Sequence, residues 1–150
     1  MTDLATLDQL FTDMPPVKAM QIRASQFDGK ILRLTAPLAA NVNDKSCAFG
    51  GSLASLMTLA GWGWLMLNLR QAGMAAEVYV ADSSIRYLAP LYDDLNGEAH
   101  LREDQDWAAI LRCLAERKRA RAAMVADVRD AAGVPVATLQ ARFALKLPGG

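Results

Sequence analysis

The spacing of apolar and polar residues changes along the chain, and each spacing predicts a type of element. Apolar residues at helical spacing over residues 4–11, followed by Pro15-Pro16, predict a short first helix that the prolines end. Residues 20–35 then alternate apolar and polar positions on either side of Asp28-Gly29, a dipeptide typical of a two-residue turn. This second region predicts a β-hairpin.

The longest stretch without charge runs from residue 46 to residue 69. Its length alone would suit a membrane span. It also contains four glycines and several hydroxyl groups, and its flanks have the patterns of water-exposed strands and amphipathic helices. We therefore predict a helix over about residues 50–70 that is buried on nearly every face, because a helix apolar all round needs protein all round.

The second half of the chain returns to strand patterns. The segment EVYVADSSIRYLAPL, residues 77–91, predicts a long strand that Pro90 ends or bends. The segment GEAHLRE, residues 97–103, predicts a shorter neighbouring strand after the Asn96-Gly97 turn signal.

A last helix and hairpin complete the pattern. Apolar residues between Trp107 and Leu114 share one face of a helix that Asp104 or Asp106 begins. Residues 121–131 and 134–147 then flank a turn, and strict alternation in the second run predicts a half-exposed hairpin.

These elements predict the α+β class, with about six mainly antiparallel strands packed against one dominant helix. A length of 150 residues is enough for one core, so we expect a single domain over residues 1–150. The order of the elements and the apolar central helix resemble the hot-dog fold, in which a curved antiparallel sheet wraps one long helix.

Composition limits the classes of partner. The chain has 16 basic and 16 acidic residues, so no overall field attracts nucleic acid or an anionic membrane. Cys47 and Cys113 lack CxxC spacing, and the acidic, polar N-terminal segment has no signal-peptide pattern, which predicts a reducing cytoplasm. With a single histidine, the chain lacks the usual ligands of a zinc site, and we predict no metal.

Chemically suggestive residues gather in NVNDKSCAFGGS, residues 41–52, directly before the buried helix. A helix N-terminus exposes unpaired N–H groups, so its backbone suits a developing oxyanion. The alternative is structural, because Asn41, Asn43 and Asp44 are types that shape turns and cap helices. Cys47 is a third possibility as a nucleophile, but no neighbouring residue supplies a base.

Two longer segments carry a closer resemblance. PLAANVNDKSCAFGGSLASLMTLAGWGWL, residues 37–65, and ADSSIRYLAPL, residues 81–91, resemble a family of bacterial hot-dog proteins labelled thioesterases, which occur alone or fused behind an acetyltransferase-like domain. The resemblance covers nearly the whole chain. It implies malonyl-acyl-carrier-protein decarboxylase activity, which supports the initiation of fatty-acid synthesis.

The same resemblance implies roles for individual residues. Asn41 stands where hot-dog thioesterases often carry a catalytic acid, eight positions before the phenylalanine, and Asn43 stands where many carry a substrate-orienting asparagine. Substrate binding is implied for the residues that begin the helix, Phe49, Gly50, Gly51 and Ser52, with the backbone amides of the first three facing the thioester carbonyl.

The residues of this segment leave three alternative functions open. Decarboxylation of a malonyl thioester needs donors for the enolate oxygen and no base, which suits Asn43 as donor or orienting group with Asn41 as its support. Hydrolysis of an acyl thioester needs a base, and Asp44 is the candidate acid in this segment. A non-catalytic acyl-binding module would bind a thioester without turnover.

The carrier of the acyl group is acyl carrier protein or coenzyme A, and the phosphopantetheine arm belongs to this substrate, so no separate cofactor is expected. Acyl carrier protein is acidic and coenzyme A carries phosphates, so the basic run over residues 112–121, with Arg117 and Arg119, could bind either. The alternative is a solvated helix end whose cations suit the C-terminal dipole. The hot-dog resemblance also implies a homodimer with the pocket between subunits.

Overall fold

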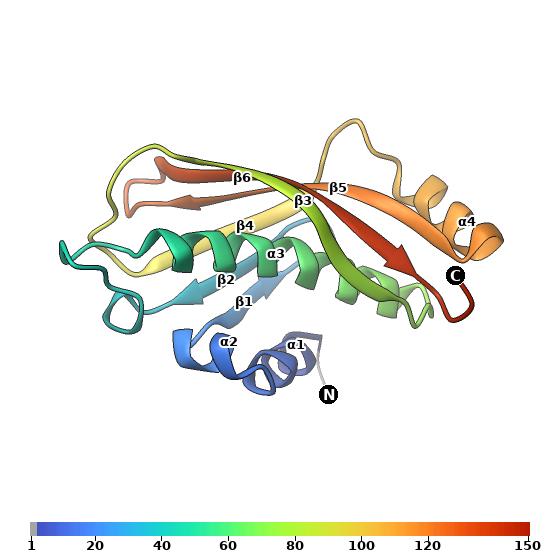
Figure 1. The fold of residues 1–150 in the computed structure, drawn as a ribbon, viewed down its shortest axis with the longest axis horizontal. Coiled ribbons are helices and arrows are strands. Elements are labelled where there is room, and N and C mark those ends of the chain that lie inside the picture. Colours follow the sequence, from blue (N-terminus) through green and yellow to red (C-terminus); the bar gives the residue numbers. More distant parts are fainter. Residues whose placement is uncertain (1–2) are drawn as a thin grey trace.

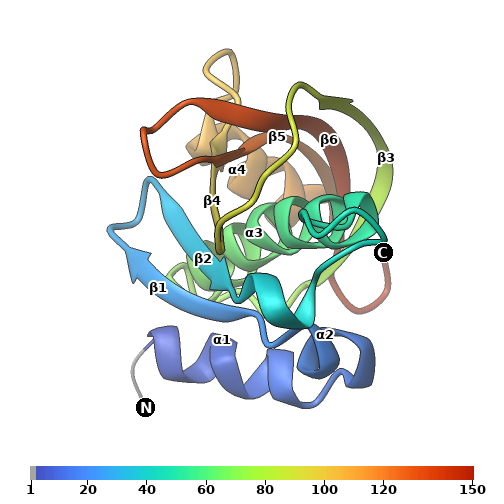
Figure 2. The same cartoon turned by 90° about the vertical axis from the view of Figure 1, so that its left-hand side faces the viewer.

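The computed structural model describes residues 3–150 (Figure 1). Its elements are, in order, α1 (Asp3–Thr12), α2 (Pro15–Met20), β1 (Arg23–Phe27), β2 (Leu32–Ala36), the 3-10 turn η1 (Leu38–Ala40), α3 (Gly50–Gln71), β3 (Glu77–Tyr87), β4 (Leu95–Leu101), α4 (Trp107–Arg117), β5 (Arg119–Arg129) and β6 (Pro135–Lys146). The six strands form one antiparallel sheet, and Figure 2 shows that it curves around α3. The predicted α+β class and central helix are confirmed.

The order of strands across the sheet is β1-β2-β4-β5-β6-β3. The prediction that residues 97–103 neighbour residues 77–91 is therefore wrong, because β4 lies between β2 and β5 while β3 pairs with β6 at the edge. Burial explains why β4 lies inside the sheet and β3 lies at its edge. Of the residues in β3 only Val78 is buried, whereas β4 buries Leu95, Gly97 and Ala99 against α3.

Helix α3 is the centre of the hydrophobic core. Two of its glycines let neighbours approach closely: a Cβ on Gly61 would lie 3.1 Å from the Phe143 ring, and one on Gly63 would lie 2.9 Å from Leu32. By length and composition α3 could cross a membrane, but 67% of its most apolar window is buried within the protein. The prediction of a helix wrapped by protein is confirmed.

The helix ends follow local chemistry, with one difference from the prediction. Pro15 and Pro16 do not only follow α1; they occupy the first positions of α2, where a missing N–H costs no hydrogen bond. At the start of α4, Asp106 is the capping residue of the two candidates, because its carboxylate accepts a hydrogen bond from the Ala108 N–H at 3.1 Å.

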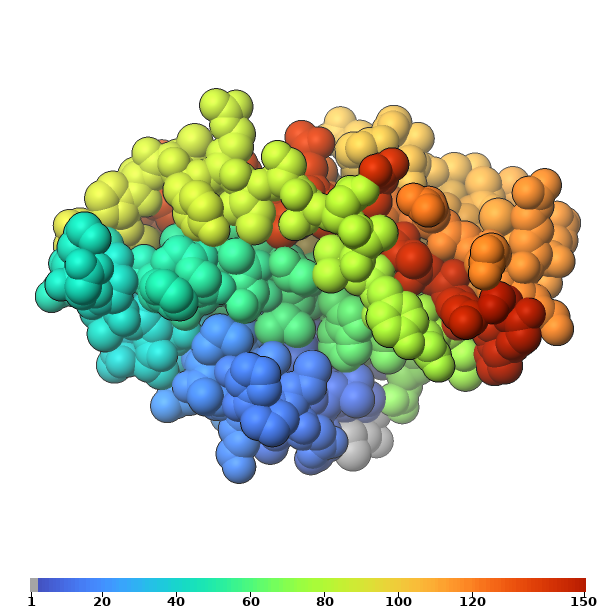
Figure 3. All heavy atoms as spheres, in the orientation of Figure 1, coloured from blue at the N-terminus to red at the C-terminus, as the bar shows by residue number. Residues whose placement is uncertain are grey.

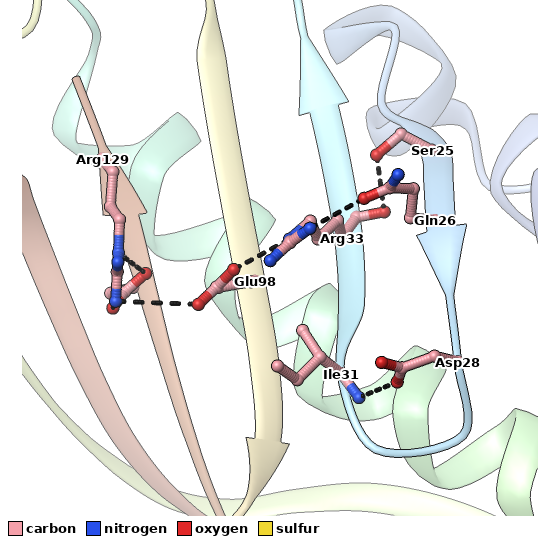
Figure 4. Close-up of polar contacts among 8 residues, drawn as sticks. Ser25, Gln26, Asp28, Ile31, Arg33, Glu98 and Arg129 are labelled. Carbon is pink, nitrogen blue, oxygen red and sulfur yellow. Dashed lines mark hydrogen bonds and ion pairs between the residues drawn. The ribbon is translucent and has the colours of Figure 1, made fainter. Parts of the chain in front are cut away.

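The outer face of the sheet carries a row of polar side chains across four strands (Figure 4). Arg33 donates to Glu98 at 2.9 Å and to Gln26 at 2.8 Å, and Arg129 lies 3.6 Å from the other Glu98 oxygen. In the β1–β2 turn, hydrogen bonds from the backbone of residues 31 and 30 lower the pKa of Asp28. These exposed contacts add little stability individually but keep this face polar.

Candidate active site

Residues 41–49 double back on themselves before α3. Val42 and Ala48 form an antiparallel bridge, and the Phe49 N–H donates to the Asn41 carbonyl at 2.7 Å. The Ala48 N–H donates to the Leu91 carbonyl at 2.8 Å, which fastens the loop to the segment after β3. The loop is thus a small, hydrogen-bonded hairpin leading into the helix.

Asn43 shapes the inside of this hairpin. Its Oδ1 accepts hydrogen bonds from the N–H groups of Lys45 at 2.8 Å and Cys47 at 3.1 Å, and its Nδ2 lies 3.2 Å from the Cys47 sulfur. The carbonyl end of the side chain is therefore engaged by the loop itself. Nδ2 carries a second hydrogen, so it is the end that can still donate to a substrate.

Asn41 anchors the hairpin to the rest of the protein. Its side chain is 3% exposed, and Nδ2 donates to the carbonyls of Met20 at 2.9 Å and Pro37 at 2.8 Å. Its Oδ1 is buried without a hydrogen-bond partner among the described residues. No hydrogen bond joins its side chain to that of Asn43 in residues 3–150, so any support for Asn43 acts through the loop backbone.

Asp44 lies at the tip of the hairpin. Its side chain is 79% exposed and forms an ion pair with Lys45 at 3.0 Å. A general base is most effective where burial or neighbours adjust its pKa and a substrate lies within hydrogen-bonding distance. Asp44 is exposed and paired with Lys45, so it has the features of a surface residue rather than those of a general base.

The N-terminus of α3 keeps two free donors. Phe49 is the N-cap and supplies no side-chain hydrogen bond, and its own N–H is already engaged by Asn41. The N–H groups of Gly50 and Gly51 make no hydrogen bond within the described chain. Of the three amides predicted to face a thioester carbonyl, two are thus available, at the positive end of a 22-residue helix.

Two aromatic rings lie beside these two glycines. A Cβ on Gly51 would lie 2.5 Å from the Phe49 ring, and a Cβ on Gly50 would lie 3.5 Å from the Tyr87 ring. Tyr87 also donates its hydroxyl to the Gly50 carbonyl at 3.3 Å. Sequence reasoning missed Tyr87, since an aromatic residue at the end of a strand gives no local sign that it reaches the start of α3.

Ser52 lies one residue beyond the two free amides. It is 4% exposed, and its hydroxyl makes no hydrogen bond within the described residues. Its N–H donates to the Phe49 carbonyl at 3.0 Å, so only the side chain is available to a ligand.

Cys47 adds no catalytic group to the loop. Its side chain is 6% exposed, and its sulfur contacts only the Asn43 amide among the polar side chains described. Within residues 3–150, no three His, Cys, Asp or Glu side chains come together as a possible metal site.

Arg117 and Arg119 lie at the other end of β3 from Tyr87. They line a cavity of about 390 Å³ together with Arg121, Lys146 and Tyr79, and we call these five residues the basic groove. None of its four cations forms an ion pair within the described chain, and a hydrogen bond to Glu77 raises the pKa of Tyr79. One chain does not bring the basic groove and the 41–52 loop together.

Comparison with known proteins places this geometry in context. Residues 4–146 match the model of the YiiD_C family, described as putative thioesterase. A protein of unknown function from Chlorobaculum tepidum TLS is 28% identical with a TM-score of 0.90, over 95% of this chain and 93% of that one. A putative thioesterase from Shewanella oneidensis is 26% identical with a TM-score of 0.86, over 97% and 98%.

A thioesterase from Haemophilus influenzae is 16% identical and has a TM-score of 0.74, over 98% of this chain and 92% of that one. At this identity the likeness concerns the fold alone. Together the comparisons confirm the predicted hot-dog fold.

Proposed function

Since the chain belongs to the YiiD_C family of putative thioesterases, we propose that it is an enzyme of acyl thioesters that decarboxylates a malonyl thioester to the acetyl thioester. The family supports the coarser part of this proposal, action on acyl thioesters. The reaction is argued from the N-terminus of α3.

The observation that carries the proposal is the pair of free amides at Gly50 and Gly51 after a loop whose acid, Asp44, is exposed and paired with Lys45. Loss of carbon dioxide breaks the bond between the carboxylate carbon and the methylene carbon, and the electron pair forms an enolate with its charge on the thioester oxygen. Backbone donors at a helix N-terminus stabilise that charge without reorganisation. Protonation of the methylene carbon by water then gives the acetyl thioester.

The polar side chains around the amides suit the same reaction. An uncharged Asn43 amide can orient the malonyl carboxylate without repelling it, as a carboxylate would. It also does not stabilise the ionic substrate as strongly as a cation would, so it leaves the ground state less favoured relative to the transition state.

Hydrolysis is the alternative function, and it requires Asp44 as the base. This side chain is exposed at the tip of the loop and paired with Lys45, without the burial that adjusts the pKa of a general base. Decarboxylation requires no base, and we favour it for that reason.

We propose further that the enzyme is a homodimer joined along the edge strand β3. Strand β3 has an unpaired edge, and Figure 3 shows α3, in green, reaching the surface beside it. Phe49 and Tyr87 beside the two amides are 54% and 56% exposed, so the site is open on one side. A second copy could cover it.

Such a dimer would also supply the carrier site. Strand β3 runs from the basic groove at Tyr79 to the start of α3 at Tyr87. Antiparallel pairing of two β3 strands would set the basic groove of a second copy at the same end of the joined sheet as the Gly50 and Gly51 amides. Its unpaired cations suit the phosphates of coenzyme A or the acidic surface of acyl carrier protein.

The test is incubation with malonyl-acyl carrier protein, following the acetyl product by mass and free thiol with a colour reagent. We expect acetyl product without thiol. Thiol without acetyl product would establish hydrolysis instead and direct attention to Asp44→Asn, and the absence of both products would contradict both reactions.

Two variants of Gly50 locate the site. Gly50→Pro removes one N–H at the first helical position, which tolerates proline, while Gly50→Ala keeps the N–H and places its Cβ at an ordinary 3.5 Å from Tyr87. We expect Gly50→Pro to lower the rate about 100- to 1000-fold, the usual effect of losing one oxyanion donor. Gly50→Ala should stay within about threefold, and equal rates in the two variants would show that the amide is not a donor. Asn43→Ala should also lose activity, but its loop contacts make it the less specific probe.

A further inference from the structure

A second pocket lies at the opposite end of α3 from the Gly50 and Gly51 amides. It has a volume of about 540 Å³ and lies between the β1–β2 turn, the end of β4, the start of α4 and the C-terminal half of α3. Figure 1 shows α4 at this end of the molecule. From Gly50 to Asn68 the helix rises about 27 Å at 1.5 Å per residue, so the two sites are separate.

Two tryptophans form rigid walls of this pocket. Trp64 of α3 and Trp107 of α4 meet edge to face, with ring centroids 5.1 Å apart and planes at 81°. Trp64 is only 4% exposed, and its indole N–H donates to the Lys30 carbonyl at 2.9 Å. Fixed aromatic walls favour a flat ring, which can stack or pack edge to face against them.

Asn68 presents an unused acceptor to the same pocket. Its side chain is 8% exposed, and Nδ2 donates to the Trp64 carbonyl at 3.0 Å. The side-chain Oδ1 has no hydrogen-bond partner among the described residues. Asn68 Oδ1 is not among the fully buried polar atoms that lack a partner in the described chain, so water reaches it from the pocket, and a ligand N–H or O–H can replace that water.

His100 lines the same pocket. Its Nδ1 lies 2.9 Å from the Leu101 carbonyl oxygen, which can only accept, so Nδ1 carries a hydrogen and donates to it. Lys30 is the charged side chain among the lining residues, and it is exposed at the rim. Its positive charge disfavours a cationic ligand, and because Lys30 is exposed to water it pairs only weakly with an anion, so the lining suits a neutral donor.

We infer that this pocket is a second ligand site, which binds a neutral planar ring compound whose N–H or O–H donates to Asn68 Oδ1. The ring packs against Trp64 and Trp107. This inference does not depend on the reaction at the other end of α3.

The test compares indole with benzofuran, a ring of the same shape in which oxygen replaces the N–H donor. Binding to the wild-type protein is followed by titration calorimetry and by the indole N–H signals of its tryptophans. We expect one saturable site per chain that moves the signals of Trp64 and Trp107 and spares that of Trp62. Indole should bind about three- to tenfold more tightly than benzofuran, as one hydrogen bond predicts.

Asn68→Leu keeps the branched shape and the number of heavy atoms of the side chain and removes the acceptor. This variant should bind both rings with nearly equal affinity, while Trp107→Ala should weaken both. A preference for indole that persists in Asn68→Leu, a response at Trp62 instead of the pocket pair, or no saturable binding of either ring to the wild-type protein would overturn the inference. The comparison of two ligands on the wild-type protein needs no variant to fold.

Discussion

At the residue scale, Asn41 and Asn43 are close in sequence but their side chains form hydrogen bonds with different parts of the protein. Asn43 holds the inside of the loop with its carbonyl oxygen, whereas Asn41 directs both hydrogens of its amide at backbone carbonyls elsewhere in the protein. The resemblance to hot-dog thioesterases places an acid at position 41. In this chain a carboxylate there would face the Met20 and Pro37 carbonyls without any donor.

We therefore predict that Asn41→Asp lowers stability in a pH-dependent way. Burial among carbonyl oxygens raises the folded-state pKa of the new carboxyl above the unfolded value of about 3.9, so the part of the penalty that comes from ionisation is absent below about pH 4 and grows as pH rises. At pH 8 we expect a loss of about 3 kcal/mol in the free energy of unfolding, measured with urea. Asn41→Leu, which cannot ionise, should lose the same amount at pH 4.5 and pH 8; equal losses at both pH values for Asn41→Asp would contradict this account.

At the element scale, the distance between α3 and the sheet depends on a glycine in the strand beneath it. Gly97 in β4 faces Leu56 of α3, and a Cβ there would lie 2.3 Å from a Leu56 methyl and 3.3 Å from the Asp127 carbonyl oxygen. Leu56 is fully buried, so its side chain has little room to turn away. The sheet can approach the helix because this position has no side chain.

Gly97→Ala should accordingly destabilise the protein by about 1–3 kcal/mol through overpacking. Leu56→Ala makes a cavity that the added methyl group partly fills, so the double variant should lose at least about 1 kcal/mol less than the sum of the two single losses. Denaturant unfolding of the four proteins measures this coupling. Strict additivity would show that the two side chains do not compete for the same space.

At the scale of the whole molecule, exposed apolar side chains are unevenly distributed. Strand β3 exposes Tyr79, Val80 and Tyr87 on the edge of the sheet, and Phe49 lies exposed at the start of α3. An apolar edge strand is a surface on which another strand can pair. The proposed dimer would bury this edge.

The proposed dimer is tested by placing a charge on the edge strand. Val80→Asp should convert the protein from dimer to monomer at micromolar concentration, measured by light scattering after gel filtration. Val134→Asp is the matched control, because Val134 is similarly exposed, 55% against 48%, but lies in the β5–β6 turn. A monomeric wild-type protein, or equal behaviour of the two variants, would contradict pairing along β3.

The amino-acid sequence by itself determined the features that depend on neighbours along the chain. The alternation over residues 134–147, the uncharged run that became α3 and the Asp28-Gly29 turn each predict the observed element, because periodicity and turn chemistry are local. The sequence also located the loop before α3 as the candidate site. The roles implied for Asn43 and Asp44 stay predictions until activity is measured.

Only the tertiary structure decided which distant groups meet. In the structure β3 lies at the edge of the sheet. The Asn41 side chain donates to the Met20 and Pro37 carbonyls, and the Tyr87 hydroxyl donates to the Gly50 carbonyl. Of the three amides predicted as donors, that of Phe49 is already hydrogen-bonded to the Asn41 carbonyl. Within one chain the basic groove does not lie at the 41–52 loop. These outcomes depend on which faces can be buried together and which distant backbone groups need hydrogen-bond partners, and neither is determined by the order of residues within a single element.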